Sequence, residues 1–448
     1  MIRRLFCGIL LLTVGVLTSW AANGFSVSVS YNGGDQGIRG YWRGSIVRYR
    51  IGGDAVTSSD TIYSKANGYA YYPVINLEGT KVAFYRWGTP SQIAVVDLAS
   101  KQVTNLAALP ADPGNEMPLD WPAGNWIYYV LPQNPGDDDP VVRQSTEIWR
   151  VNVSTKANEK YVYINDGRVP MPPTPSGWGP LFPAFIRRLE ISLDGTRAAI
   201  QGNNFAHPDG SYYNVNSVYC FPPPGGTVSD DGACYIGNPG ASCNISLSCS
   251  GGYCAGYISG WHDLLTTGKL PGAIGPSIAD LQLNTIESWY GQDIGQGAEL
   301  VRWARNSDKW VLQQIAFSGL EVGGGSNQVL ANWVDHKAIR TSHNIKGDHW
   351  SSCTGDFWVD GGAANAGKYE GADGVWRTPA VTGTDRSIHQ RSPLSGARFQ
   401  SRAQEISLKK SGSAGANSVA GTRSAYDLRG RNKTRTTVES AGIGIVKN

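Results

Sequence analysis

The chain contains one ten-residue pattern twice, as INLEGTKVAF at residues 75–84 and as ISLDGTRAAI at residues 191–200. Each copy reads as the end of an apolar strand, an acid–Gly pair, and a second apolar strand. This order is typical of a tight antiparallel hairpin. Because an internal repeat decides the architecture before any single residue does, the two copies favour one structural unit that the chain uses several times.

Related units occur between and after the two copies. Hairpin patterns recur at residues 119–130, 243–258 and 298–316, and strand pairs such as QIAVVDLASKQVTNL (92–106) and TEIWRVNVSTKANEKYVYI (146–164) follow some of them. A hairpin followed by two more strands is a four-stranded meander, the blade of a β-propeller. The predicted turns lie at Gly79, Gly124, Gly195, Gly252 and Asp308.

The two ends of the repeat region are incomplete in complementary ways. GDFWVDG (355–361) begins a unit without a visible second half, whereas GSIVRYRIGGD (44–54) and TIYSKA (61–66) resemble the last two strands of a unit. We therefore predict an all-β propeller over residues 25–361, with six blades favoured and seven as the alternative. Pairing of the N-terminal strands with the last C-terminal blade strands would close the ring and remove exposed sheet edges. An open β-sandwich followed by a second β domain is the alternative fold.

The N-terminus has the features of an export signal. Arg3 and Arg4 precede the apolar run LFCGILLLTVGVL (5–17), and Ser19 and Ala21 supply small residues for cleavage. The alternative is a membrane anchor, but the apolar run is short for a hydrocarbon layer of about 30 Å. We predict a signal peptide over residues 1–21, no membrane span after its removal, and a location outside the cell or on its outer surface.

Composition agrees with an exported all-β protein. Only 17% of the residues are charged, and the chain has 56 glycines and 15 tryptophans. The basic residues after Arg386 are scattered among Ser, Gly and Ala without aromatic residues, so no nucleic-acid partner is predicted. Residues 362–422 are rich in Gly, Ala and Ser, which is typical of a linker, and residues 423–448 resemble a short β ending.

Six cysteines follow the predicted signal peptide. An even number in an exported chain predicts disulfides, whose pairing the sequence leaves open. Paired C-x-x-C spacing is missing, so a zinc site is disfavoured. The candidate disulfide cysteines are Cys220, Cys234, Cys243, Cys249, Cys254 and Cys353.

LEGTKVAFYR (77–86) and LDGTRAAIQG (193–202) resemble the TolB-like (WD40-like) propeller repeat, although the usual Ser-Pro before the acid is replaced by Asn-Leu and Ser-Leu. The C-terminus resembles the end of a type IX secretion sorting domain, through YDLRGR (426–431) and SAGIGIVK (440–447). The position in the second motif that is usually aromatic is Gly444. The second resemblance implies a Gram-negative bacterium, passage through the type IX secretion machinery, and release or attachment at the cell surface.

Residues that could carry chemistry are few. The sequence has no G-x-S-x-G, H-E-x-x-H or Walker A motif. His336, His343 and His349 lie close together in the sequence and could hold a divalent metal, and PGDDDP (135–140) could hold calcium, although neither cofactor is the favoured interpretation. Trp178 and Trp261, in predicted loops, could stack on sugar rings.

These residues favour a non-catalytic binding module for a glycan or a surface protein. The first alternative is a carbohydrate-active enzyme, similar to a polysaccharide lyase, with a His-centred metal site. The second is a structural scaffold. Fold alone does not decide between them.

Overall fold

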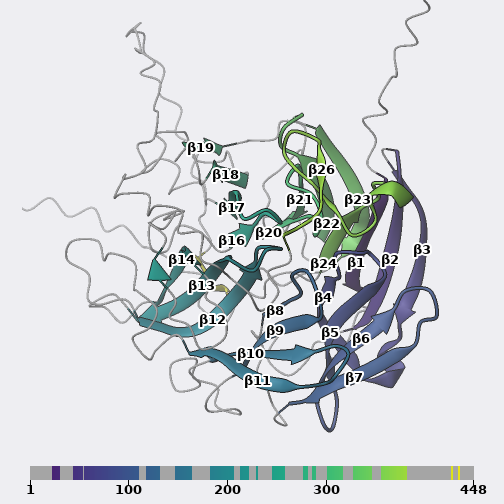
Figure 1. Ribbon diagram of the computed structural model, residues 1–448, viewed down its shortest axis with the longest axis vertical. Helices are drawn as coiled ribbons and strands as arrows, with labels where there is room; N and C mark the ends of the chain where they lie inside the picture. The colour runs from purple at the N-terminus through teal and green to yellow at the C-terminus, as the bar shows by residue number, and fades with distance from the viewer. Residues whose placement is uncertain are drawn as a thin grey trace, which may run out of the picture. The chain divides into compact units, whose positions relative to one another are not determined.

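The computed structural model is an all-β propeller whose strands form sheets around a common centre (Figure 1). It divides into the units Met1–Ala403 and Gln404–Asn448. No helix in the part of the chain that the structure describes is long and apolar enough to span a membrane. The described residues are 23–30, 44–53, 55–109, 118–131, 147–163, 182–205, 212–220, 229–230, 245–257, 276–280, 285–288, 300–315, 326–335, 337–345, 355–380, 425–426 and 432–433.

Within these residues the first unit contains six four-stranded antiparallel sheets. We number them sheets 1 to 6 in ring order and give their strands from the centre outward. Sheet 1 is β24 (Gly355–Val359), β1 (Gly24–Ser30), β2 (Ser45–Gly52) and β3 (Ala55–Tyr63); sheet 2 is β4 (Tyr69–Ile75), β5 (Lys81–Trp87), β6 (Gln92–Asp97) and β7 (Val103–Ala108); sheet 3 is β8 (Leu119–Asp120), β9 (Trp126–Leu131), β10 (Glu147–Asn152) and β11 (Asn158–Tyr163).

The second half of the ring follows the same order. Sheet 4 is β12 (Phe182–Ile191), β13 (Arg197–Phe205), β14 (Tyr212–Cys220) and β15 (Ser229–Asp230); sheet 5 is β16 (Ile245–Leu247), β17 (Tyr253–Tyr257), β18 (Pro276–Asp280) and β19 (Thr285–Ser288); sheet 6 is β20 (Leu300–Trp303), β21 (Trp310–Ile315), β22 (Ser326–Asn332) and β23 (Lys337–Ile345).

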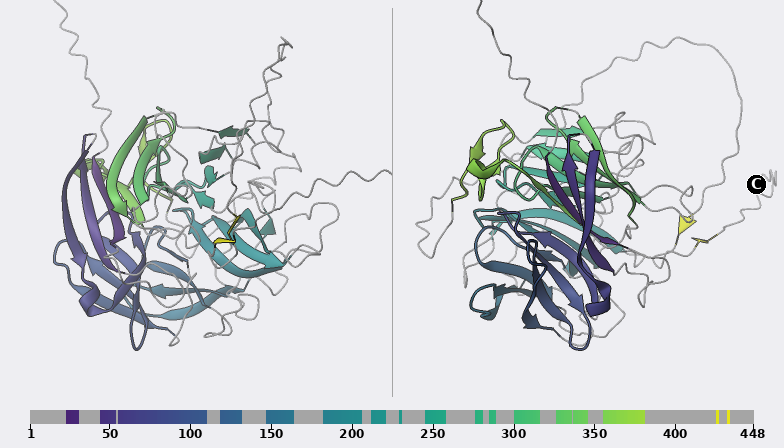
Figure 2. Two further views of the ribbon diagram at one scale, coloured as in Figure 1. Left: turned by 180° about the vertical axis from the view of Figure 1, so that it is seen from behind. Right: turned by 90° about the vertical axis from the view of Figure 1, so that its right-hand side faces the viewer.

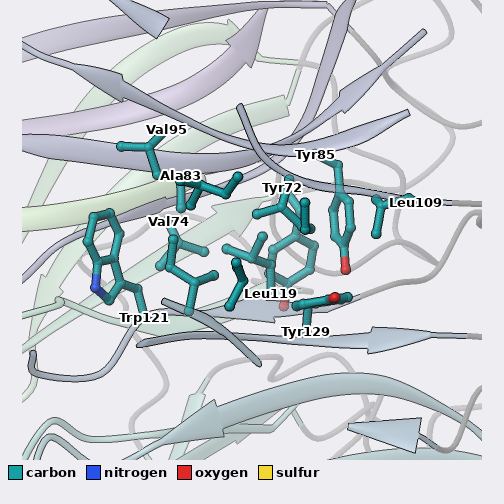
Figure 3. Close-up of a cluster of buried hydrophobic side chains, with 14 of the residues drawn as sticks. Tyr72, Val74, Ala83, Tyr85, Val95, Leu109, Leu119, Trp121 and Tyr129 are labelled. Atoms are coloured by element: carbon teal, nitrogen blue, oxygen red, sulfur yellow. The ribbon is translucent and has the colours of Figure 1, made fainter. Parts of the chain in front are cut away.

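Apolar side chains pack between neighbouring sheets, because each strand directs alternate residues to opposite faces. Between sheets 2 and 3, Val74, Tyr85, Leu119, Trp121 and Tyr129 belong to one buried cluster (Figure 3). Similar clusters join sheets 1 and 2, 3 and 4, 5 and 6, and 6 and 1, while hydrogen bonds join sheets 4 and 5. Every sheet therefore contacts the next, and the last contacts the first.

The predicted closure of the ring is confirmed. Strand β1 pairs antiparallel with β24, with Gly24 opposite Val359 and Ser28 opposite Gly355. The sequence interpretation missed β1 itself, because its serines are buried as well as Phe25, Val27 and Val29, so the strand lacks the expected polar–apolar alternation. The first and last strands of the propeller thus share one sheet.

The two edges of the ring carry different connections. Tight turns follow the innermost strands of sheets 2 to 6, at residues 76–80, 121–125, 192–196, 248–252 and 304–309, and lie at what we call the turn edge. In an antiparallel meander the second-to-third and fourth-to-first connections leave at the opposite edge, which we call the loop edge. The longer connections leave there, at residues 31–44, 132–146, 164–181, 231–244, 258–275, 289–299, 316–325 and 346–354.

Local details differ from the sequence interpretation at three places. The turn residue with left-handed backbone in sheet 5 is Gly251, with φ of 71°, rather than Gly252. The Pro- and Gly-rich stretches 171–183 and 220–234 predict loops, yet Phe182 and Pro183 begin β12, and Ser229–Asp230 form β15.

Residues 361–380, which we call the cap, fold back onto the turn edge although the sequence predicted a linker from residue 362. The cap contains the short helix η3 (Ala363–Asn365) and a hairpin of β25 (Tyr369–Glu370) with β26 (Trp376–Arg377). It lies to one side of the ring strands in the side view (Figure 2). Trp376 explains the packing, because it lies against the buried cluster that joins sheets 6 and 1. Within the cap it also covers Gly361 so closely that a Cβ there would lie 2.5 Å from the ring.

The second unit is described over four residues. Ala425 and Tyr426 in β27 pair with Lys433 and Asn432 in β28 (Asn432–Lys433). These two strands flank the first of the two motifs that resemble a sorting domain, and of that motif only Tyr426 is among the described residues. The second motif lies outside the described residues.

One surface ion-pair group joins sheets 1 and 2 and gives a pH-dependent prediction. Arg48 donates two hydrogen bonds of 2.9 Å to Asp60, and Lys101 lies 3.2 Å from the same carboxylate. The hydrogen bond from Arg48 lowers the pKa of Asp60 below its ordinary value. Stability from this group is therefore present above pH ~4 and is lost as the pH falls through the lowered pKa.

The wild type should lose unfolding free energy between pH 7 and pH 3, because Asp60 becomes protonated. In Asp60→Asn this loss should be smaller, by up to about 1 kcal/mol, because the pair is partly solvated. Urea unfolding at both pH values measures this difference. An identical pH dependence in the variant and the wild type would contradict the prediction.

Candidate functional site

The innermost strands lie next to the ring axis (Figure 1), and six equivalent residues of the repeat lie on them, one per sheet. Each occupies what we call the axial position, immediately before an apolar residue that in sheets 2 to 6 leads into the turn-edge turn and in sheet 1 is Phe357. In the two sequence repeats it directly precedes Ile75 and Ile191. The axial residues are Val74, Asp120, Glu190, Ser246, Arg302 and Asp356, and all six are buried.

Four axial side chains accept a hydrogen bond from the main chain of the next sheet. Asp356 Oδ2 accepts from Ile75 N at 2.7 Å, and Asp120 Oδ2 accepts from Ile191 N at 2.6 Å. Glu190 Oε2 accepts from Leu247 N at 3.0 Å, and Ser246 Oγ accepts from Trp303 N at 2.8 Å. One repeat position thus supplies the same bond between successive sheets.

Two arginines of sheet 6 reach across the axis. Arg305 Nε donates to Ile75 O at 3.0 Å and its Nη2 donates to Asp120 Oδ1, so it contacts sheets 2 and 3. Arg302 Nη1 donates to the carbonyl oxygens of Pro73 and Gly355, both at 3.3 Å. The axis is therefore bridged by cations as well as by carboxylates.

The charges balance within the buried group that we call the axial cluster. Its three arginines, Arg188, Arg302 and Arg305, face three carboxylates, Asp120, Glu190 and Asp356. Arg188 Nη1 donates to Glu190 Oε1 at 3.1 Å, and Arg302 Nε lies 3.5 Å from Asp356 Oδ1. A buried charge needs such pairing, because desolvation of an isolated ion costs several kcal/mol.

Burial raises the pKa of Glu190 above its ordinary value, against the opposing charges of Arg302 and Arg188. Its two oxygens already accept bonds from Arg188, Ser246 and Leu247. The carboxylates of the axial cluster thus hold neighbouring sheets together, and their oxygens are directed at the protein itself.

Above the axial cluster, at the turn edge, lies a small apolar layer. Leu77, Leu193 and Cys249, three residues beyond the axial positions of sheets 2, 4 and 5, are buried against Ala123 and against Tyr369 of the cap. Cys249 Sγ donates to Asp308 Oδ1 at 3.0 Å, and burial raises the pKa of the thiol well above its ordinary value.

Two of the predicted disulfide cysteines, Cys249 and Cys254, are buried in the packed interior. Cys249 is a thiol that donates a hydrogen bond to Asp308, so the predicted disulfide is not formed at this residue. Cys220 ends β14 but its side chain is not described, and Cys234, Cys243 and Cys353 lie outside the described residues.

The two candidate sugar-stacking tryptophans belong to loop-edge connections. Trp178 lies in the connection between β11 and β12, and Trp261 lies in the connection between β17 and β18. Both lie outside the described residues, as does the acidic stretch 135–140 between β9 and β10. The ends of the described strands place the attachment points of all three connections on one edge of the ring.

The three candidate histidines attach to different parts of sheet 6. Position 336 directly precedes β23 at the turn edge, His343 lies on β23, and position 349 follows β23 at the loop edge. β23 has nine residues and is therefore about 30 Å long. It is also the outermost strand of its sheet. The backbone thus separates the attachment points of His336 and His349, and it does not direct all three residues to the axis; their side chains are not described.

The sequence interpretation missed the axial cluster, although a signal for it is present. When the repeats are aligned on the turn-edge turns, a charged residue occupies the same position of an otherwise apolar strand in Asp120, Glu190, Arg302 and Asp356. A charge at one fixed repeat position indicates a shared environment, and in a ring of repeats that environment is the axis.

No family model matches this chain, and no curated protein matches its sequence. Among solved structures, TolB from Acinetobacter baumannii is 12% identical, with a TM-score of 0.45 over 75% of this chain and 66% of that chain. The β-propeller domain of the trilobed protease from Pyrococcus furiosus is 11% identical, with a TM-score of 0.37 over 70% of this chain and 80% of that one.

A prolyl endopeptidase is 12% identical, with a TM-score of 0.37 over 80% of this chain. This chain spans about half of that endopeptidase, namely 54% of its length. The assignment of the propeller itself rests on the sheet topology and ring closure described above. The resemblance of the C-terminus to a sorting domain stays a prediction.

Proposed function

We propose that this protein is an exported, non-catalytic binding propeller that holds a glycan or a surface protein at its loop edge. One observation carries the proposal: the axis is filled by the ion-paired axial cluster, whereas the long connections leave the ring together at the loop edge. Binding residues of scaffolded proteins are concentrated on such loops, which vary while the frame stays fixed.

We further propose that the six sheets are the complete ring, as in a six-bladed TolB-like propeller. The continuous contacts from sheet 1 to sheet 6 and back to sheet 1 support this number. The leader at residues 1–21 and the C-terminal motifs support export from a Gram-negative cell through the type IX machinery.

The loop tryptophans provide the test. We expect the purified protein to retain members of a glycan array or an extracellular protein, and Trp178→Ala with Trp261→Ala to reduce binding at least tenfold, because stacked aromatic rings supply much of the energy of such interfaces. Trp376→Ala, in the cap at the turn edge, is the control and should bind as the wild type does. Loss of binding in the control but not in the loop variants would contradict the proposal.

A further inference from the structure

The cap inserts one aromatic side chain into the apolar layer at the turn edge of the axis. Tyr369 packs against the buried cluster of Leu77, Leu193 and Cys249, which come from three different sheets, and Ala123 of a fourth sheet packs against the same cluster. No single sheet could provide this apolar surface, which we call the turn-edge pocket. The pocket lies over the axial cluster, because its residues follow the axial positions by three residues in each sheet.

Glu370, the residue after Tyr369, forms main-chain hydrogen bonds to the ring of the kind found in peptide recognition. Asp308 N donates to Glu370 O at 2.7 Å, and Glu370 N donates to Asn306 O at 2.8 Å. Ser307 and Glu370 form a parallel β-bridge. Addition of an extended segment to exposed main-chain groups, with side chains entering separate pockets, is one established mode of peptide binding.

The side chain of Glu370 is recognised as well. Ser307 Oγ donates to Glu370 Oε2 at 2.9 Å, and Lys309 Nζ lies 3.7 Å from Oε1. The carboxylate thus has one hydroxyl donor and one cation, while the neighbouring tyrosine has an apolar pocket. Together these contacts distinguish an aromatic–acidic pair from other dipeptides.

We propose that the turn-edge pocket is a binding site for an extended protein segment that carries an aromatic residue followed by an acidic one, and that Tyr369 and Glu370 occupy it in cis. The hairpin closes its own turn through Gly371 N, which donates to Val375 O at 2.9 Å, and through the exposed Asp373–Arg377 pair. These contacts lie within the hairpin and do not depend on the pocket, whereas Trp376 packs against the buried cluster that joins sheets 6 and 1. Opening of the cap as a unit therefore requires Tyr369, Glu370 and Trp376 to leave the ring together.

Covalent attachment gives the cap a high effective concentration at the pocket. A partner segment therefore binds measurably only when the cap is weakened or when the partner makes further contacts. The site is independent of the proposed loop-edge site, because it lies at the opposite edge of the ring.

The test uses the full chain and a fluorescent peptide of residues 365–377. We expect the double variant Tyr369→Ala, Glu370→Ala to bind this peptide at least tenfold more tightly than the wild type, whose pocket is filled. Tyr69→Ala, which removes an exposed tyrosine outside the pocket, is the matched control and should behave as the wild type does. A peptide with alanine at both positions should not bind.

Equal binding of the peptide to all three proteins, or no binding to a folded double variant, would overturn the proposal. If the double variant does not fold, hydrogen exchange on the wild type decides. We expect amides of residues 366–377 to exchange through an opening that leaves the ring strands protected. Exchange of the cap only together with the ring would show that the cap is inseparable and would refute the site.

Discussion

Replacement of Asp120 by alanine is expected to lower the free energy of unfolding by about 3–5 kcal/mol, the range for removal of one partner of a buried ion pair. Asp120 is fully buried, accepts the bond from Ile191 N, and pairs with Arg305. In the variant the buried Arg305 guanidinium keeps Asp356, whose carboxylate lies farther away, at 3.8 Å. The backbone amide of Ile191 in sheet 4 loses its hydrogen-bond acceptor. Urea unfolding followed by tryptophan fluorescence measures the change.

The matched control is Asp373→Ala, which removes the aspartate of an exposed Asp–Arg pair in the cap. Its unfolding midpoint should equal that of the wild type, because water solvates both partners of that pair. A loss below 1 kcal/mol for Asp120→Ala would mean that the axial cluster does not hold the sheets together, contrary to our interpretation.

The second large effect is expected at Gly79, in the turn of the first sequence repeat. Its backbone has φ of 67°, and a Cβ there would lie 2.4 Å from the ring of Trp358 in sheet 1. Trp358 is fixed by its Nε1, which donates to Leu77 O at 2.8 Å. Gly79→Ala should therefore cost about 1–2 kcal/mol of backbone strain and about 1–3 kcal/mol of overpacking.

Gly124→Ala separates these two contributions. Gly124 has φ of 90°, yet a Cβ there would meet no atom within 4 Å, so this variant has the backbone strain without the steric clash. Thermal or urea unfolding of both variants should show Gly79→Ala as the less stable. Equal losses would indicate that Trp358 moves aside without cost.

The repeated hairpin could be predicted from the sequence because the residues that specify it are close together in the chain. An acid–Gly pair between two apolar strands specifies a hairpin within ten residues, and the same order at Ile75–Phe84 and Ile191–Ile200 specified a ring of such hairpins. The half-units at the two ends of the repeat region predicted that N-terminal and C-terminal strands share the closing sheet, although the strand that pairs with β24 is β1, which the prediction did not include. Strand β1 was not predicted, because both of its faces are buried and a burial pattern of alternating exposed and buried residues is therefore missing.

Less of the candidate site could be predicted from the sequence. The attachment of Trp178 and Trp261 to one edge of the ring follows from strand directions, which the sequence order of the meander implies. The separation of His336 from His349 depends on β23 lying between them as a continuous strand, and the thiol state of Cys249 depends on burial beside Asp308.

By itself, the sequence determined the hairpins, the meander order and the closure of the ring, because turn chemistry and strand patterning act between near neighbours in the chain. Only the tertiary structure decided what fills the axis and covers its turn edge. Arg305 contacts Ile75 across 230 residues, and Tyr369 packs against a cluster formed by three different sheets. Such contacts depend on the ring bringing one residue from each repeat to a common centre, where a charge is stable only if the opposite sheet supplies its partner.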